Sequence, residues 1–126
     1  MKYIFSIILN LIFASCFAQG AEIFFEKDFE KLPKIEEGDP VGIYYPFKNT
    51  GDKALNIVNY TVPCVCTKVR FPLKPIMPGE QDSVYVTFDS IGKKGVQDRS
   101  IKIYSNAVNS PAEIRFRLAV KPKKKD

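Results

Sequence analysis

The chain has 126 residues and a formal net charge of +5 at pH 7, and it contains neither histidine nor tryptophan. Without an imidazole, it lacks the base that activates a serine or cysteine nucleophile and the commonest nitrogen ligand of zinc. We therefore expect that the protein is not an enzyme and that it has no catalytic residues and no cofactor.

The first 18 residues are typical of a secretory signal peptide. Lys2 supplies the positive charge, an apolar run extends from Tyr3 to Phe13, and Ala18 ends the segment. The apolar run is shorter than the ~20 residues that cross a bilayer. We expect cleavage after Ala18, export to the periplasm or cell envelope, and no transmembrane span in the mature chain. In the alternative interpretation a degraded lipobox ends at Cys16, and its lipidation would anchor the protein to a membrane.

The rest of the chain divides into one domain and a short tail. Residues 19–121 have the length of a single β-sandwich domain, which is about 100 residues. Residues 122–126 form a basic tail in which lysine predominates. Because an exported protein does not usually meet nucleic acid, we do not interpret the positive charge as a nucleic-acid-binding surface.

Apolar and polar residues alternate along most of the domain, which is the pattern of half-buried strands. In chain order, strands are expected at residues 21–26, 41–48, 54–62, 84–88, 101–104 and 113–120. Residues 28–39 are rich in charge and are expected to form an extended connection. Pro46 cannot donate a ladder hydrogen bond, so its strand should be bulged there or lie at a sheet edge. Pro78-Gly79 predicts a type II turn.

No segment has the 3.6-residue period of an amphipathic helix. Short strands separated by turn residues predict an all-β protein, an antiparallel β-sandwich of about seven strands.

Four motifs follow one another along this domain. They are Phe47-Lys48-Asn49-Thr50-Gly51, Cys64-Val65-Cys66-Thr67, Pro75-Ile76-Met77-Pro78-Gly79-Glu80 and Ile101-Lys102-Ile103-Tyr104-Ser105-Asn106. Their order resembles the secreted bacterial family called domain of unknown function 1573, over about residues 22–121. The resemblance implies an immunoglobulin-like sandwich and no established activity. The family usually has Ser-Cys-Gly-Cys-Thr at the cysteine motif, where this chain has Pro63 and Val65 in place of the serine and the glycine.

Cys64 and Cys66 are the candidate site, and on a strand they would point to the same side. Our first interpretation is a pair of buried thiols that pack as small hydrophobes. The second is a disulfide, which an oxidising compartment favours. In an extended chain the two Cα atoms would be ~6.6–7 Å apart, so closure needs a kink that Val65 resists. The third is a metal site for Cu(I), for which Met77 is the one candidate for an additional soft ligand.

Lys102, Arg115 and Arg117 share the outward parity of their strands, with Tyr104 among them. They would form a basic stripe on one sheet face. We interpret the stripe as an ordinary exposed face whose charges discourage edge-to-edge association.

These features predict a non-catalytic immunoglobulin-like binding or assembly module of the bacterial cell envelope. The expected partner is another envelope protein or complex, bound by strand addition or by face packing. The alternative is a thiol- or copper-handling protein that uses Cys64 and Cys66. A third hypothesis is binding of a carbohydrate or other surface polymer, with Tyr44, Tyr85 and Tyr104 stacked on sugars. No nucleic acid partner is expected.

Overall fold

The structure is a computed structural model, and it describes residues 20–123. The expected signal peptide (residues 1–18) lies outside the described residues, and so does the lipidation alternative at Cys16. Residues 124–126 of the basic tail also lie outside them. Within residues 20–123, no helix is long and apolar enough to cross a membrane.

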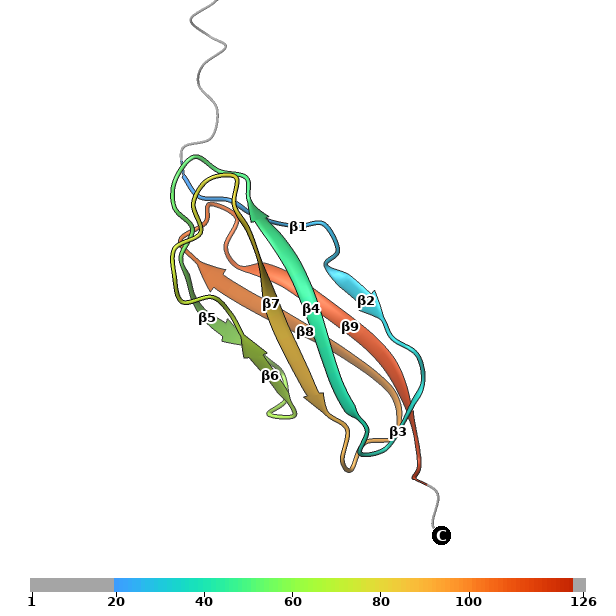
Figure 1. The fold of residues 1–126 in the computed structure, drawn as a ribbon. Helices are drawn as coiled ribbons and strands as arrows, with labels where there is room; N and C mark the ends of the chain where they lie inside the picture. Colours follow the sequence, from blue (N-terminus) through green and yellow to red (C-terminus); the bar gives the residue numbers. More distant parts are fainter. Residues whose placement is uncertain (1–19, 124–126) are drawn as a thin grey trace, which may run out of the picture.

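Two β-sheets pack face to face (Figure 1). The first sheet contains, in spatial order, β1 (Ile23–Phe25), β4 (Pro40–Asn49), β7 (Gln81–Asp89) and β6 (Thr67–Arg70). The second sheet contains β2 (Phe29–Lys31), β9 (Ala112–Lys121), β8 (Gly95–Ser105) and β5 (Ile57–Thr61), and β3 (Ile35–Glu36) also pairs with β9. The predicted all-β sandwich is confirmed, with nine strands in the described part of the chain where about seven were expected.

Residues 28–39, which were expected to form an extended connection, instead contribute β2 and β3. Both strands pair in parallel with β9, so that Phe29 lies opposite Arg115 and Ile35 lies opposite Val120. The second sheet is therefore mixed rather than wholly antiparallel. Strands of three and two residues are too short to display a period of two, so the sequence pattern could not reveal them.

Pro46 lies inside β4 without a bulge, because β4 pairs with β7 in one unbroken register. On its other side β4 pairs with β1 only through its last three residues, Phe47 to Asn49. The N–H of Thr50 donates to the carbonyl of Glu22 on the β1 side. Backbone groups alternate along a strand, so the nitrogen of Pro46 faces that same side, one residue beyond the last β1 pair. The prediction of a bulge at Pro46 is wrong. The prediction of a sheet edge holds for the part of β4 from Pro40 to Pro46, which has no partner on the β1 side.

The core is formed by the inward residues of the long strands. Ile43 lies opposite Val86 and Tyr45 lies opposite Val84, so the inward side chains of β4 and β7 meet in rows. Burial of each such aliphatic side chain contributes about 1.5–3 kcal/mol. The fully buried residues of the second sheet that complete the core include Ile101, Ile103, Ile114 and Phe116.

The hydroxyl of Tyr45 links the two sheets. The side chain is buried, and its hydroxyl donates a 2.8 Å hydrogen bond to the backbone carbonyl of Arg115 on β9. Burial raises the pKa of Tyr45 above its ordinary value of 10.0, and the charge of Glu30 raises it further. Because the folded state disfavours the ionised form, this contribution to stability is present below about pH 10 and is lost as the pH rises above it.

We predict that Tyr45→Phe lowers the free energy of unfolding at pH 7 by about 1 kcal/mol, because the carbonyl of Arg115 loses its donor. The variant should also lose less stability than the wild type between about pH 8 and about pH 11, because phenylalanine does not ionise. Urea unfolding at each pH measures both effects, with the exposed Tyr44→Phe as the control. If the wild type, Tyr45→Phe and Tyr44→Phe lost the same amount of stability between about pH 8 and about pH 11, ionisation of Tyr45 would not be the cause of the loss.

The side chain of Asn49, the last residue of β4, is fully buried. Its amide nitrogen donates to the carbonyls of Lys53 and Ile76, at 2.7 and 2.8 Å. Its amide oxygen accepts hydrogen bonds from the N–H groups of Gly51 and Glu22, at 3.0 and 3.3 Å. One amide therefore connects β1, the turn after β4 and the segment that precedes β7.

Asn49→Asp keeps the shape of this side chain but removes both donors, and it directs a carboxylate at two carbonyl oxygens. We predict that the variant is less stable than the wild type by about 3 kcal/mol. Asn59→Asp, on the exposed side of β5, should change stability by less than about 0.5 kcal/mol. Chemical denaturation measures the free energy of unfolding of both variants. Similar small losses of stability in the two would show that the hydrogen bonds of the Asn49 side chain do not stabilise the fold.

Candidate functional site

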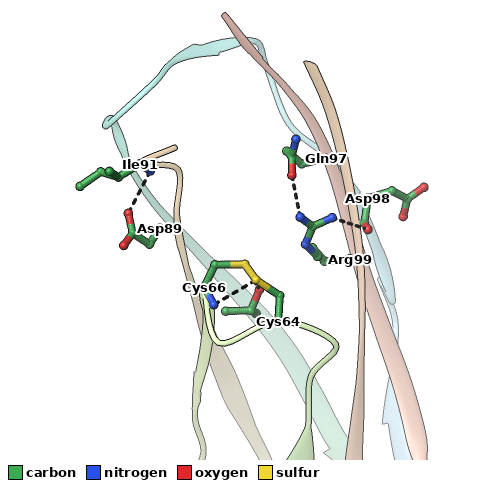
Figure 2. The surroundings of a disulfide bond; sticks show 8 residues. Cys64, Cys66, Asp89, Ile91, Gln97, Asp98 and Arg99 are labelled. Carbon is green, nitrogen blue, oxygen red and sulfur yellow. Dashed lines mark hydrogen bonds between the residues drawn. A yellow bond between two sulfur atoms is a disulfide. The ribbon is translucent and has the colours of Figure 1, made fainter. Parts of the chain in front are cut away.

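Cys64 and Cys66 lie in a tight turn before β6, not on one face of a strand as expected. The N–H of Thr67 donates to the carbonyl of Cys64 at 3.1 Å, which closes a β-turn with Val65 and Cys66 at its centre. The two cysteine Cα atoms are 5.2 Å apart, and the sulfur atoms are joined in a disulfide (Figure 2). The turn supplies the kink that an extended chain lacks, because it brings alternate Cα atoms within disulfide range.

The disulfide turn attaches the start of β6 to the end of β7. The N–H of Asp89 donates to the carbonyl of Cys66 at 2.8 Å, and Thr67 is buried opposite Phe88. Both cysteines are half-buried, whereas Val65 at the tip of the turn is 93% exposed. The turn therefore fixes one corner of the first sheet.

Met77, considered above as an additional ligand for Cu(I), lies at the opposite end of the first sheet. Its carbonyl accepts from the N–H of Glu80, just before β7, whereas Cys66 bonds to Asp89 at the other end of that strand. The intervening strand residues span roughly 30 Å. Between residues 20 and 123, no group of three or more histidine, cysteine, aspartate or glutamate residues could hold a metal ion. The copper alternative therefore rests on the sulfurs of Cys64 and Cys66, whose disulfide would have to be reduced before they could act as thiolate ligands.

We predict that the double variant Cys64→Ala/Cys66→Ala is destabilised by about 1.6 kcal/mol, the chain-entropy value for a three-residue loop. Intact mass after alkylation in denaturant, with and without prior reduction, measures the state of the two sulfurs in protein from its native compartment. Val65→Ala is the control, and it should leave stability within about 0.5 kcal/mol of the wild type. Alkylation of both cysteines without reduction would contradict the disulfide and favour the buried-thiol interpretation.

The basic stripe of Lys102, Arg115 and Arg117 lies on the outer face of the second sheet, but acids are interspersed with it. Arg115 donates two hydrogen bonds to the carboxylate of Asp98, at 2.8 and 2.6 Å. These bonds hold the pKa of Asp98 below its usual range. Arg117 lies opposite Asp98, and Lys102 lies opposite Glu113. Each cation of the stripe has an acid beside it, as is typical of an ordinary exposed face.

The outer face of the first sheet has a different composition, and we call it the tyrosine face. Tyr44 on β4 lies opposite Tyr85 on β7, and Tyr85 lies opposite Arg70 on β6. The outward residues that define this face are Gly42, Tyr44, Pro46, Lys68, Arg70, Ser83, Tyr85 and Thr87. Three neighbouring strands therefore contribute aromatic, hydroxyl and cationic groups to one surface.

The two tyrosine rings of this face stack against each other. Their centroids are 4.5 Å apart and their planes are inclined by 35°. Tyr85 lies over Gly42, where a Cβ atom would collide with the tyrosine hydroxyl and lie 2.9 Å from ring carbon Cζ. The glycine thus lets the Tyr85 ring rest on the sheet backbone. Tyr44 is 67% exposed, so the pair presents aromatic surface to solvent.

No ion pair within residues 20–123 involves the cations of the tyrosine face. The pairs found there are Lys27–Glu30, Arg115–Asp98 and Lys121–Glu36. Lys68 and Arg70 lie opposite Thr87 and Tyr85. Asp82 lines the same surface hollow as Arg70, and Asp89 lines the same hollow as Lys68, so the two outer faces differ in their ion pairs and not in the presence of acids.

Two solvent-open hollows meet at Tyr85. One of about 720 Å³ is bounded by residues that include Tyr44, Arg70 and Ser83. The other, of about 480 Å³, is bounded by residues that include Lys68 and Thr87, and it reaches the disulfide turn. The tyrosine ring stands between them, so the surface is an elongated trough and not a closed pocket.

The structure brings Tyr44 and Tyr85 together, and it places Tyr104 on the second sheet, opposite Asn59. Arg70 was not identified from the sequence as a candidate. Its outward position follows from the alternation of β6, but its place beside Tyr85 depends on which strands are neighbours. The alternation of polar and apolar residues along one strand does not show which strands are its neighbours in the sheet.

The topology and the core define the class of the protein, an immunoglobulin-like β-sandwich domain. The family model described as "Protein of unknown function (DUF1573)" matches residues 23–120, and the chain belongs to this family. The resemblance inferred from the four motifs is therefore confirmed. No curated protein matches the chain significantly.

Three solved structures have similar folds. A protein of unknown function from Porphyromonas gingivalis W83 is 16% identical, with 85% of this chain and 50% of that one covered and a TM-score of 0.68. The VesB protease of Vibrio cholerae is 16% identical, with 79% and 31% covered and a TM-score of 0.61. PapD-like domain 7 of human CEP192 is 11% identical, with 89% and 94% covered and a TM-score of 0.56. The chain spans half or less of the first two proteins, and at these identities the likeness shows the fold alone.

Proposed function

We propose that this protein is a non-catalytic binding or assembly module of the bacterial cell envelope and that it binds through the tyrosine face. The observation that carries the proposal is the contrast between the two outer faces. Arg115 on the second sheet is paired with Asp98, whereas Arg70 and Lys68 make no ion pair within residues 20–123 and lie on the strand beside Tyr85, which stacks on Tyr44. Tyrosine and arginine are the residues that most often dominate the energy of binding surfaces.

Face packing is favoured over strand addition because the edge strands β6 and β5 are short and interrupted, and because the part of β4 that has no partner on the β1 side begins at Pro40 and ends at Pro46. The edge strand β6 has four residues, and it is bounded by the disulfide turn and by Pro72. The edge strand β5 has five residues, and its register shifts between Ile57 and Asn59. Short, irregular and proline-bounded edges resist the addition of another strand.

The thiol- or copper-handling alternative has no comparable support, because Met77 lies far from the cysteines.

Site-specific photocrosslinking in the native bacterium tests the proposal. A benzophenone side chain replaces Thr87 on the tyrosine face or, as the matched control, Ser100 on the second sheet. We expect ultraviolet-dependent adducts with envelope material from Thr87 and none from Ser100, in protein that begins at Gln19 and is recovered from the periplasm or envelope. An adduct with another envelope protein or complex and an adduct with a surface polymer would each support the proposal, and the composition of the adduct distinguishes these two partner classes. Absence of adducts at Thr87, adducts at Ser100 alone, or recovery from the cytoplasm would contradict the proposal.

A further inference from the structure

We propose that the occupant of the tyrosine face is an anionic polysaccharide, whose sugar rings stack on Tyr44 and Tyr85 and whose acid groups bind Arg70 and Lys68. This inference rests on the proposed function, because it takes the tyrosine face as the binding surface. It goes further by assigning the ligand class and the residues that recognise each part of it.

The aromatic pair has the geometry of a stacking platform. Tyr85 is held against the backbone at Gly42, so its ring is constrained before any ligand arrives. Tyr44 stacks on it at 4.5 Å and remains exposed. The C–H groups on one side of a pyranose ring match a flat aromatic face, and the phenol hydroxyls at the rim can bond to sugar hydroxyls. A preorganised platform reduces the entropy lost when the ligand is ordered.

The cations lie on the strand next to Tyr85, and two acids, Asp82 and Asp89, also line the hollows. Arg70 is directly opposite Tyr85. Lys68 precedes Arg70 by two residues and lies on the same face of β6. Residues two apart on a strand are separated by about 6.6 Å. A polymer with a negative charge on successive sugars can therefore contact both cations. A guanidinium binds a carboxylate, sulfate or phosphate through two parallel hydrogen bonds.

The shape of the face favours a chain over a compact ligand. The two hollows, of about 720 and 480 Å³, are open to solvent and continue past Tyr85 on either side. Hydroxyl groups of Ser83 and Thr87 lie in this trough, where they can donate to and accept from sugar hydroxyls. Exposed apolar side chains also line the hollows, among them Leu73 and Val65, but neither hollow is an enclosed pocket of the kind that takes the apolar anchor of a protein partner. The sugar polymer therefore fits the face better than a folded protein does.

The test uses purified protein without its signal segment and three polymer probes, which are polygalacturonate, dextran sulfate and neutral dextran. We expect titration calorimetry to detect binding of at least one acidic polymer that weakens with added salt, and no binding of neutral dextran. Tyr44→Ala and Arg70→Gln should each weaken that binding by about tenfold, the equivalent of one stacking contact or one charge-assisted bond. Arg117→Gln on the second sheet is matched in charge and should leave the affinity within about twofold of the wild type.

Three results of the titrations would overturn the inference. One is failure to bind either acidic polymer. Another is an equal loss of affinity in Arg70→Gln and Arg117→Gln, which would indicate attraction to net charge. The third is a loss in Arg70→Gln with none in Tyr44→Ala, which would remove the stacking role. If photocrosslinks at Thr87 contain only protein, the polysaccharide inference fails and the proposed function stands; if no crosslinks form there, the proposed function fails as well.

Discussion

The pairing register of β4 and β7 is the constraint on which both the core and the tyrosine face depend. Side chains alternate along a strand, so the register that points Tyr45 and Val84 inward also points Tyr44 and Tyr85 outward. A slip of one residue would exchange the two sets and bury the face. Asn49 resists such a slip, because its backbone N–H donates to Glu80 at 3.0 Å and its backbone carbonyl accepts from Gly79 at 2.8 Å.

The two sheets of the sandwich share one core but differ in what they present to solvent. The second sheet compensates its charges in place, through the Arg115–Asp98 pair and its neighbours. On the first sheet Arg70 and Lys68 make no ion pair within residues 20–123 and lie beside Tyr85 and Thr87, although Asp82 and Asp89 line the same hollows. We therefore propose the binding surface on the first sheet, where aromatic rings and cations that are not ion-paired lie together.

The long strands could be predicted from the sequence because each has an inward and an outward set that differ in polarity. The short strands β2 and β3 could not, since their pairing is set by β9, which follows them by some eighty residues. The disulfide shows the same limit. In an extended chain the Cα atoms of Cys64 and Cys66 would lie at or beyond the usual disulfide limit, so a kink was expected. The turn that supplies the kink is held by Thr67 and by Asp89 on β7.

The tyrosine face was only partly predictable for the same reason. From residue type alone, Tyr44, Tyr85 and Tyr104 were equally good candidates for stacking on sugars. Their separation onto different sheets depends on topology, as does the place of Arg70 beside Tyr85. A glycine beneath an aromatic ring is also a property of two paired strands, and neither strand reveals it alone.

The most direct measurement is an NMR titration of ¹⁵N-labelled protein with short polygalacturonate oligomers. The account predicts chemical-shift changes that concentrate on Gly42, Tyr44, Arg70 and Tyr85, with the resonances of β8 and β9 unmoved. Changes concentrated on the second sheet, or no changes at saturating oligomer, would contradict it.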